Sequence, residues 1–261
     1  MTQEERRIYL INELLKEGKY EDQRPQDEQG QRDLLRSLMN VREPMPVSDG
    51  FLKVQDEYLQ ERNRERGVTD ICSLMPFSEK NSHLYLWQGD ITTLNVDAIV
   101  NAANSALLGC FAPLHICIDN CIHTFAGIQL RLACNELMEK QGKPEGTGLC
   151  KITPAFNLPS GYVLHTVGPI IRTTVGPRDK MLLSNCYENC LQTAADNGLE
   201  SVAFCCISTG VFRFPAELAA EIAVETVSSW LKENESSSVK KVVFNVFGDN
   251  DLEIYTRVLG R

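Results

Sequence analysis

The chain has 261 residues, of which 43% are hydrophobic and 23% charged, values that are typical of a soluble globular protein. Its formal net charge of −9 argues against non-specific binding to nucleic acid, which requires a basic face. We find no apolar run long enough to cross a membrane and no signal-peptide pattern. We therefore expect a cytoplasmic protein that binds neither nucleic acid nor membrane, with its ten cysteines present as thiols.

The first part of the chain is polar and contains three stretches in which apolar residues recur at helical spacing. They lie at 8–15, 34–39 and 51–67. Within the third, the charged run 57–67 is predicted to be mainly solvated. We assign residues 1–75 to a helical N-terminal extension and residues 76–261 to a separate domain. The extension is interpreted as a cap that packs on this domain, with a docking surface for a partner as the alternative.

After Ile71 the pattern alternates between strands and helices, which is typical of a three-layer α/β fold. The run 201–207 is continuously apolar and is therefore predicted to be a central strand. The other predicted strands are 83–88, 96–100, 149–155, 162–167 and 239–247. The predicted helices are 124–141, 177–198, 215–233 and 252–259.

The loop after the predicted strand 96–100 carries residues suited to binding a metal. Cys110, His115 and Cys117 have the spacing C-x4-H-x-C, and thiolate and imidazole are ligands that Zn²⁺ prefers. Three protein ligands leave a fourth coordination position open, as in catalytic zinc sites. The alternative is a loop in which one or two cysteines are merely buried. Cys121 is predicted to lie on the buried face of a helix that starts near Asp119, and His123 to be a core or capping imidazole.

Several polar residues follow predicted strands and are candidates for ligand contacts. Asp90 lies just past a strand, and Asn101 and Asn104 carry amides that can both donate and accept hydrogen bonds. Each could equally form a turn. Asp119 is interpreted as a helix N-cap, a general base, or both.

Two further candidates lie later in the chain. The loop 208–212 precedes a predicted helix, where exposed N–H groups can hold a phosphate. Phe247 ends the last strand and is either an aromatic platform or a core residue.

The motifs GDIT (89–92), VDAIVNAAN (96–104) and ISTG (207–210), together with the strand 242–247, resemble the macrodomain family, an ADP-ribose-binding α/β module. The loop GCFAPLHICIDNCIHTFAG (109–127) resembles the zinc-containing branch of the bacterial macrodomain hydrolases. The resemblance covers Leu84 to Leu259. It implies a three-layer α/β/α macrodomain with a mixed central sheet, and one Zn²⁺ per chain on Cys110, His115 and Cys117.

The resemblance also implies roles for the other candidates. Asn104, and with it Asn101, would contact the distal ribose, while Asp119 would orient or deprotonate the nucleophile. The remaining substrate-binding residues would be Asp90 and Ile91 at adenine, Ser208, Thr209, Gly210, Val211 and Phe212 at the phosphates, and Phe247 stacked on adenine. Two features depart from the family pattern. The segment CFAPLHIC (110–117) replaces a Gly-rich loop, and Arg213 replaces a frequent Gly.

The resemblance implies a zinc-dependent hydrolase that removes mono-ADP-ribose from protein side chains, most plausibly at an Asp or Glu ester. Its partners would be ADP-ribose and an ADP-ribosylated protein, for which a lipoyl-carrier protein modified by a sirtuin-type transferase is one candidate. Three alternatives stay open at this point. They are an ADP-ribose reader without catalysis, a deacetylase for O-acetyl-ADP-ribose, and a purely structural role for the zinc.

Overall fold

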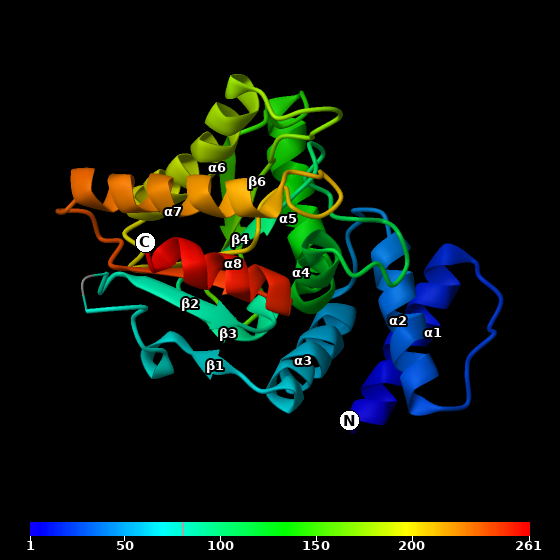
Figure 1. Ribbon diagram of the computed structural model, residues 1–261. Helices are drawn as coiled ribbons and strands as arrows, with labels where there is room; N and C mark the ends of the chain where they lie inside the picture. Colours follow the sequence, from blue (N-terminus) through cyan, green and yellow to red (C-terminus); the bar gives the residue numbers. More distant parts are fainter. Residues whose placement is uncertain (80) are drawn as a thin grey trace.

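The computed structural model describes residues 1–79 and 81–261 of the chain, in which a helical N-terminal part lies beside an α/β part (Figure 1). The two parts have separate apolar clusters. The smaller cluster belongs to the N-terminal helices, and it includes one residue of the α/β part, Ile128. The extension therefore packs on the domain in part through an apolar contact at Ile128.

The extension consists of α1 (Gln3–Gly18), α2 (Glu28–Val41) and α3 (Asp49–Arg66). Each helix begins directly after a residue whose side chain accepts a hydrogen bond from the first helical turn, which satisfies an N–H group that has no partner within the helix. These caps are Thr2, Asp27 and Ser48.

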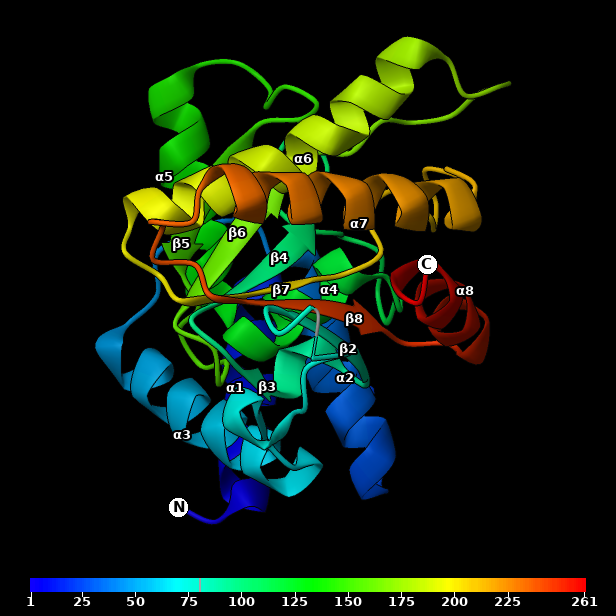
Figure 2. The ribbon, with the colours of Figure 1, turned by 60° about the vertical axis from the view of Figure 1, so that its left-hand side comes forward.

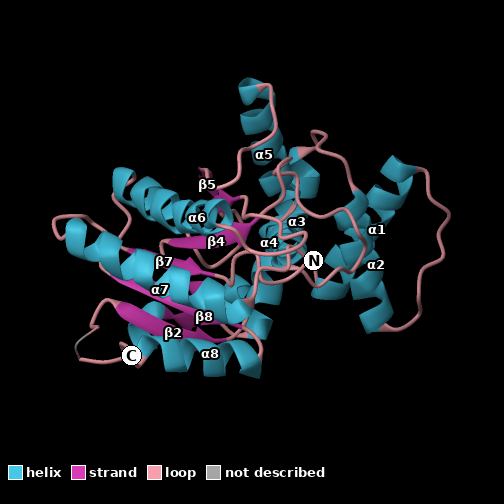
Figure 3. Ribbon diagram, turned by 45° about the horizontal axis from the view of Figure 1, so that its top comes forward, coloured by secondary structure: helices cyan, strands magenta, loops and turns pink. Residues whose placement is uncertain are grey.

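The α/β part is built on a six-stranded sheet, whose strands lie between helices (Figure 3). The strand order is β2-β8-β7-β4-β6-β5 (Figure 2). All neighbouring strands are parallel except β5 and β6, so the predicted mixed sheet is confirmed. The strands are β2 (Leu84–Gln88), β4 (Ala98–Ala102), β5 (Cys150–Pro154), β6 (Tyr162–Thr166), β7 (Ser201–Phe204) and β8 (Lys241–Val246). A separate parallel pair joins β1 (Thr69–Asp70) to β3 (Leu94–Asn95).

Helices cover both faces of this sheet, which confirms the three-layer architecture. In Figure 2, α6 and α7 lie along one face, whereas α4 lies on the other face together with the N-terminal helices. The helices of this part are α4 (Ile118–Ala126), α5 (Ile128–Gln141), α6 (Pro177–Asp196), α7 (Ala216–Glu233) and α8 (Asp249–Leu259). None of the helices in the described residues combines the length and the hydrophobicity that a membrane crossing requires.

Two details of the predicted elements are wrong. The helix predicted at 124–141 is interrupted at Gly127, which has φ +96° and ends α4 before α5 begins. A Cβ at this position would lie 2.7 Å from Gln55 Nε2, so Gly127 also permits close packing of α3. The run 57–67 is less solvated than predicted, since Tyr58 and Asn63 are buried. Asn63 lies inward because its amide donates to the carbonyl of Asn157 in the domain.

Candidate functional site

The parallel strands bring four of the predicted site segments to one edge of the sheet. Asp90 follows β2, Phe247 follows β8, the loop 208–212 follows β7, and Asn104 follows β4. The carboxyl ends of parallel strands meet at the same edge, where α/β folds bind ligands. The strand order places Asp90 and Phe247 after the neighbouring strands β2 and β8 at one end of the sheet, and Asn104 two strands from β8, after the interior strand β4.

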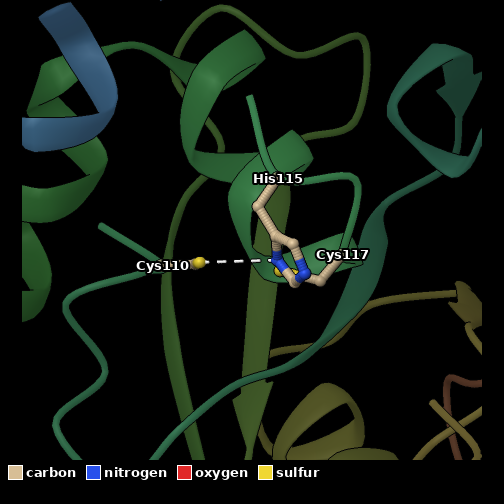
Figure 4. A group of neighbouring side chains, drawn as sticks. All are labelled: Cys110, His115 and Cys117. Atoms are coloured by element: carbon tan, nitrogen blue, oxygen red, sulfur yellow. Dashed lines mark hydrogen bonds between the residues drawn. The ribbon is translucent and has the colours of Figure 1, made fainter. Parts of the chain in front are cut away.

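The three predicted metal ligands converge in the loop that follows β4 (Figure 4). Cys110 Sγ lies 3.5 Å from His115 Nδ1, and the ligand atoms of Cys110, His115 and Cys117 all lie within 4.8 Å of one another. Tetrahedral zinc with ordinary Zn–S and Zn–N bond lengths separates a sulfur from a nitrogen ligand by roughly 3.5 Å. The donor set and its spacing therefore fit a zinc ion.

Cys117 also begins helix α4. Its Sγ accepts a hydrogen bond from the backbone N–H of Asn120 at 3.4 Å, so Cys117 is the N-cap, and the interpretation of Asp119 as N-cap is wrong. Burial raises the pKa of Cys117 to about 12, and the neighbouring Cys110 contributes in the same direction. A divalent cation would offset the cost of two neighbouring thiolates, which is a second reason why this set suits a metal.

Asp119 lies in the first turn of α4 and is buried, with 5% of its surface exposed. Its two oxygens accept hydrogen bonds from amides on the neighbouring strand and loop, from Asn101 Nδ2 at 2.8 Å and from Asn104 Nδ2 at 3.2 Å. Burial raises the pKa of Asp119 to about 6, partly offset by the Asn101 hydrogen bond and the positive charge of Arg131. The carboxylate can therefore exchange a proton near neutral pH.

The two asparagines occupy different environments. Asn101 is fully buried, and its Nδ2 lies 3.2 Å from His165 Nδ1 as well as close to Asp119. Asn104 is half-buried; it donates to the carbonyl of Gly109 at 2.9 Å and accepts from the N–H of Ala106. Asn104 thus lies at the surface of the site and holds the backbone at Gly109, just before the predicted metal ligand Cys110.

Two other residues near the loop are His123 and Cys121. His123 is buried, and its ring packs against Gly109, where a Cβ would lie 2.8 Å from the imidazole. Burial lowers the pKa of His123 well below its usual value, with His165 and Arg131 adding to the effect. Cys121 is half-buried on α4 and lies outside the cluster of three ligands.

The loop after β7 has the features of an anion cradle. Ser208 has φ +66° and a buried hydroxyl that lacks a partner among the described residues. The loop folds back on itself through Phe214 N–H to the carbonyl of Ser208 and Arg213 N–H to the carbonyl of Gly210. In the described part of the chain, the N–H groups of 210–212 donate to no protein acceptor, so they are free to bind a phosphate. Arg213 is exposed.

The end of the sheet formed by β2 and β8 carries Asp90 and Phe247. One Asp90 oxygen accepts from the N–H and hydroxyl of Thr92, and the other accepts from Arg66 at the end of α3. The guanidinium of Arg66 also lies 3.5 Å above the centre of the Phe125 ring. Ile91 beside Asp90 is buried. Phe247 is 77% exposed, so its interpretation as a core residue is wrong and an aromatic platform remains.

Sequence analysis missed several residues that shape this site. Arg36 and Asn40 of α2 contact the loop 110–117, Arg66 contacts Asp90, and His165 contacts Asn101. Their partners lie far away in sequence, so no local pattern marks them. His165 lies within the predicted strand 162–167, and a histidine among the apolar residues of a strand is itself a signal of a polar network.

Comparison with known proteins identifies the family. A model of the Macro domain family matches residues 100–223. A protein named protein-ADP-ribose hydrolase from Treponema medium is 57% identical, covering 99% of this chain and 100% of the relative. One of the same name from Staphylococcus aureus strain MSSA476 is 51% identical, covering 97% of this chain and 94% of the relative.

The fold comparison agrees. The structure of a Trypanosoma brucei macrodomain in complex with ADP-ribose superposes with a TM-score of 0.67 and 29% sequence identity, covering 86% of this chain and 95% of that one. From the family match, the full-length relatives and the shared three-layer fold, we conclude that this chain belongs to the macrodomain family.

Proposed function

We propose that the protein is a zinc-dependent hydrolase that removes mono-ADP-ribose from modified protein side chains. The observation that carries the proposal is the buried carboxylate of Asp119, which lies in the first turn of α4 directly after the proposed metal ligand Cys117 at the N-cap. The amides of Asn101 and Asn104 donate to its two oxygens. A site of this kind combines a candidate base with an adjacent metal. Relatives that share half or more of the sequence over nearly the whole chain are named protein-ADP-ribose hydrolases, which supports the same reaction.

The substrate would lie along the edge of the sheet. Asp90 and Ile91 would contact adenine, with Phe247 stacked on the ring. The N–H groups of residues 210–212 would bind the diphosphate, because they have no acceptor within the described part of the chain. Asn104 would then face the distal ribose, close to Asp119.

In the reaction, water adds across the bond between the distal ribose and the side-chain carboxyl group, releasing ADP-ribose and a free Asp or Glu. Asp119, ionised above its pKa of about 6, accepts a proton from the attacking water. Asn101 and Asn104 hold the carboxylate in place during this transfer. Zinc, if held by Cys110, His115 and Cys117, would supply a Lewis acid to this site.

The natural substrate would be an ADP-ribosylated protein with an ester linkage, and a lipoyl-carrier protein modified by a sirtuin-type transferase is one candidate. A deacetylase for O-acetyl-ADP-ribose would use the same groups on a smaller ester. A reader without catalysis would have no use for a buried carboxylate, whose burial opposes folding at neutral pH. This observation favours an enzyme over a reader.

The test measures zinc by elemental analysis, together with release of ADP-ribose from an automodified transferase before and after chelation. We expect one zinc per chain and loss of release on chelation, with circular dichroism unchanged. Activity that survives complete removal of zinc would contradict a catalytic metal. Zinc without release from any ester-linked substrate would instead support the reader, with the metal stabilising the loop.

A further inference from the structure

We propose that the helical extension forms part of the catalytic site, because Arg36 and Asn40 on α2 position the metal loop of residues 110–117. The functional consequence rests on the proposed hydrolase, but the contacts themselves do not. Both residues bind backbone groups of the loop and not the side-chain atoms that would hold the metal, so we describe them as positioning residues.

Arg36 connects the extension to both ends of the loop. Its Nη2 donates to the carbonyl of His115 at 2.8 Å and to Asn120 Oδ1 at 2.8 Å. Asn120 in turn donates from Nδ2 to the carbonyls of Cys110 at 3.2 Å and Ala112 at 3.0 Å. A single guanidinium thereby fixes the backbone at one ligand directly and at another through Asn120.

Asn40 holds the middle of the same loop. Its Oδ1 accepts from the N–H of Leu114 at 3.1 Å, while its Nδ2 donates to Thr124 Oγ1 on α4 at 3.0 Å. Leu114 has φ +58°, a conformation that is unfavourable for a residue with a Cβ and needs support from its surroundings. Asn40 is 1% exposed, so its amide is in a fixed position and can supply that support.

Arg131 on α5 joins the end of α2 to the start of the loop. Its Nη1 donates to the carbonyls of Asn40 at 3.0 Å and Met39 at 3.3 Å, and its Nε donates to the carbonyl of Leu108 at 2.7 Å. The position of α2 and the position of the loop therefore depend on the same buried side chain. A shift of α2 would be transmitted to the metal ligands.

The loop needs this external support because it has little structure of its own. In the part of the chain that the structure describes, the only backbone hydrogen bond within 110–117 joins His115 N–H to the carbonyl of Ala112. Ile116 is 86% exposed and Leu114 is 40% exposed, so the loop buries little apolar surface. A segment with few internal contacts opens readily unless neighbouring elements hold it. Groups that orient metal ligands from outside commonly determine metal affinity.

The experiment compares Arg36→Ala with Arg32→Ala, one helical turn earlier on α2. Arg32 forms ion pairs with Glu28 and Glu65, both inside the extension, and is a matched control. Backbone hydrogen exchange is followed in peptides covering 108–118, and zinc loss to a chelator is timed. We expect Arg36→Ala to accelerate both by roughly tenfold or more, the factor for losing a hydrogen bond to a charged group. Arg32→Ala should leave both unchanged.

Turnover adds a second readout. Arg36→Ala should lower kcat while leaving the affinity for ADP-ribose near that of the unmodified protein, because the adenine and phosphate contacts are not altered. Arg36→Met, which keeps the aliphatic stem and removes the donors, should behave in the same way if Arg36→Ala folds poorly. Exchange in strands β7 and β8 reports whether the fold is intact.

Unchanged exchange and zinc retention in both Arg36 variants would overturn the proposal, as would an equal acceleration in Arg32→Ala. If the unmodified protein lacks zinc or hydrolytic activity, the proposed function fails. The exchange comparison then still decides whether α2 positions the loop. The two failures are therefore distinguishable.

Discussion

Asn101 Nδ2 on β4 lies 2.8 Å from Asp119 Oδ1 on α4, and the same nitrogen lies 3.2 Å from His165 Nδ1 on β6. Burial lowers the pKa of His165 to about 3, so its imidazole is neutral and can accept a hydrogen bond on Nδ1. Its Nε2 then donates to Thr153 Oγ1 at 2.9 Å. Both amide hydrogens of Asn101 are thus directed inside the protein, which makes Asn101 an orienting residue for Asp119.

Replacement of Asn101 by Ala should reduce kcat by roughly 10- to 100-fold, as is usual when an orienting group is removed. The affinity for ADP-ribose should change little, because Asn101 is fully buried. Loss of this donor also raises the pKa of Asp119 further, since the Asn101 hydrogen bond lowers it. The acid limb of the kcat profile should therefore move to higher pH, which steady-state kinetics between pH 5 and 9 can measure.

Asn189→Ala is the control for that experiment. Asn189 lies on α6, and its amide donates to the carbonyl of Gly148 rather than to Asp119. It should leave kcat and the pH profile unchanged. A large loss of ADP-ribose affinity in Asn101→Ala, with kcat preserved, would show that Asn101 contacts the ligand after all.

Asp119→Ala should slow release of ADP-ribose by about 10²- to 10⁴-fold, the usual contribution of a general base. Binding of ADP-ribose, measured by calorimetry, should persist, because the proposed adenine and phosphate contacts come from other strands. Loss of binding with unchanged residual kinetics would contradict the catalytic role of Asp119.

The raised pKa of Asp119 predicts that the free energy of unfolding of the metal-free protein depends on pH. Its pKa is raised from 3.8 to about 6 on folding, so the folded state binds the proton more tightly and ionisation opposes folding as pH rises. The penalty is absent below about pH 4, grows between pH 4 and 6, and is complete above pH 6. It amounts to about 3 kcal/mol at most.

Asp119→Asn removes this titration. The free energy of unfolding of the variant, relative to the unmodified protein, should increase between pH 4 and pH 7. Urea unfolding of chelator-treated protein at both pH values measures this change, and a fixed loss of one hydrogen bond cancels in the comparison. A difference that is the same at pH 4 and pH 7 would mean that the carboxylate does not titrate in this range.

The sequence carries enough information to predict the sheet edge but not the contacts that surround it. Buried strands have recognisable apolar runs, and the polar residues directly after them, such as Asp90 and Asn104, must lie at one edge when strands are parallel. The break at Gly127 was missed because glycine within a helical pattern is often tolerated. Its positive φ depends on packing against Gln55, a contact between distant segments.

The contacts made by polar residues on amphipathic helices also could not be predicted from the sequence. Arg36 and Arg66 have the same local pattern as the exposed Arg64, and only the docking of the helices on the domain distinguishes them. The convergence of Cys110, His115 and Cys117 was predictable because the three residues are close in sequence, and their candidate ligand atoms lie within 4.8 Å of one another.

Phe247→Ala should weaken binding of ADP-ribose without affecting the fold. The side chain is 77% exposed, so its removal loses little packing and the melting temperature should be unchanged. Stacking of a base on an aromatic ring contributes about 1–3 kcal/mol, which corresponds to roughly a 5- to 150-fold rise in Kd by calorimetry. Tyr20→Ala, which removes another exposed aromatic ring but from the extension, is the matched control. Because both variants remove an exposed ring, equal affinities would exclude Phe247 as the adenine platform and leave Asp90 and Ile91 to hold the base.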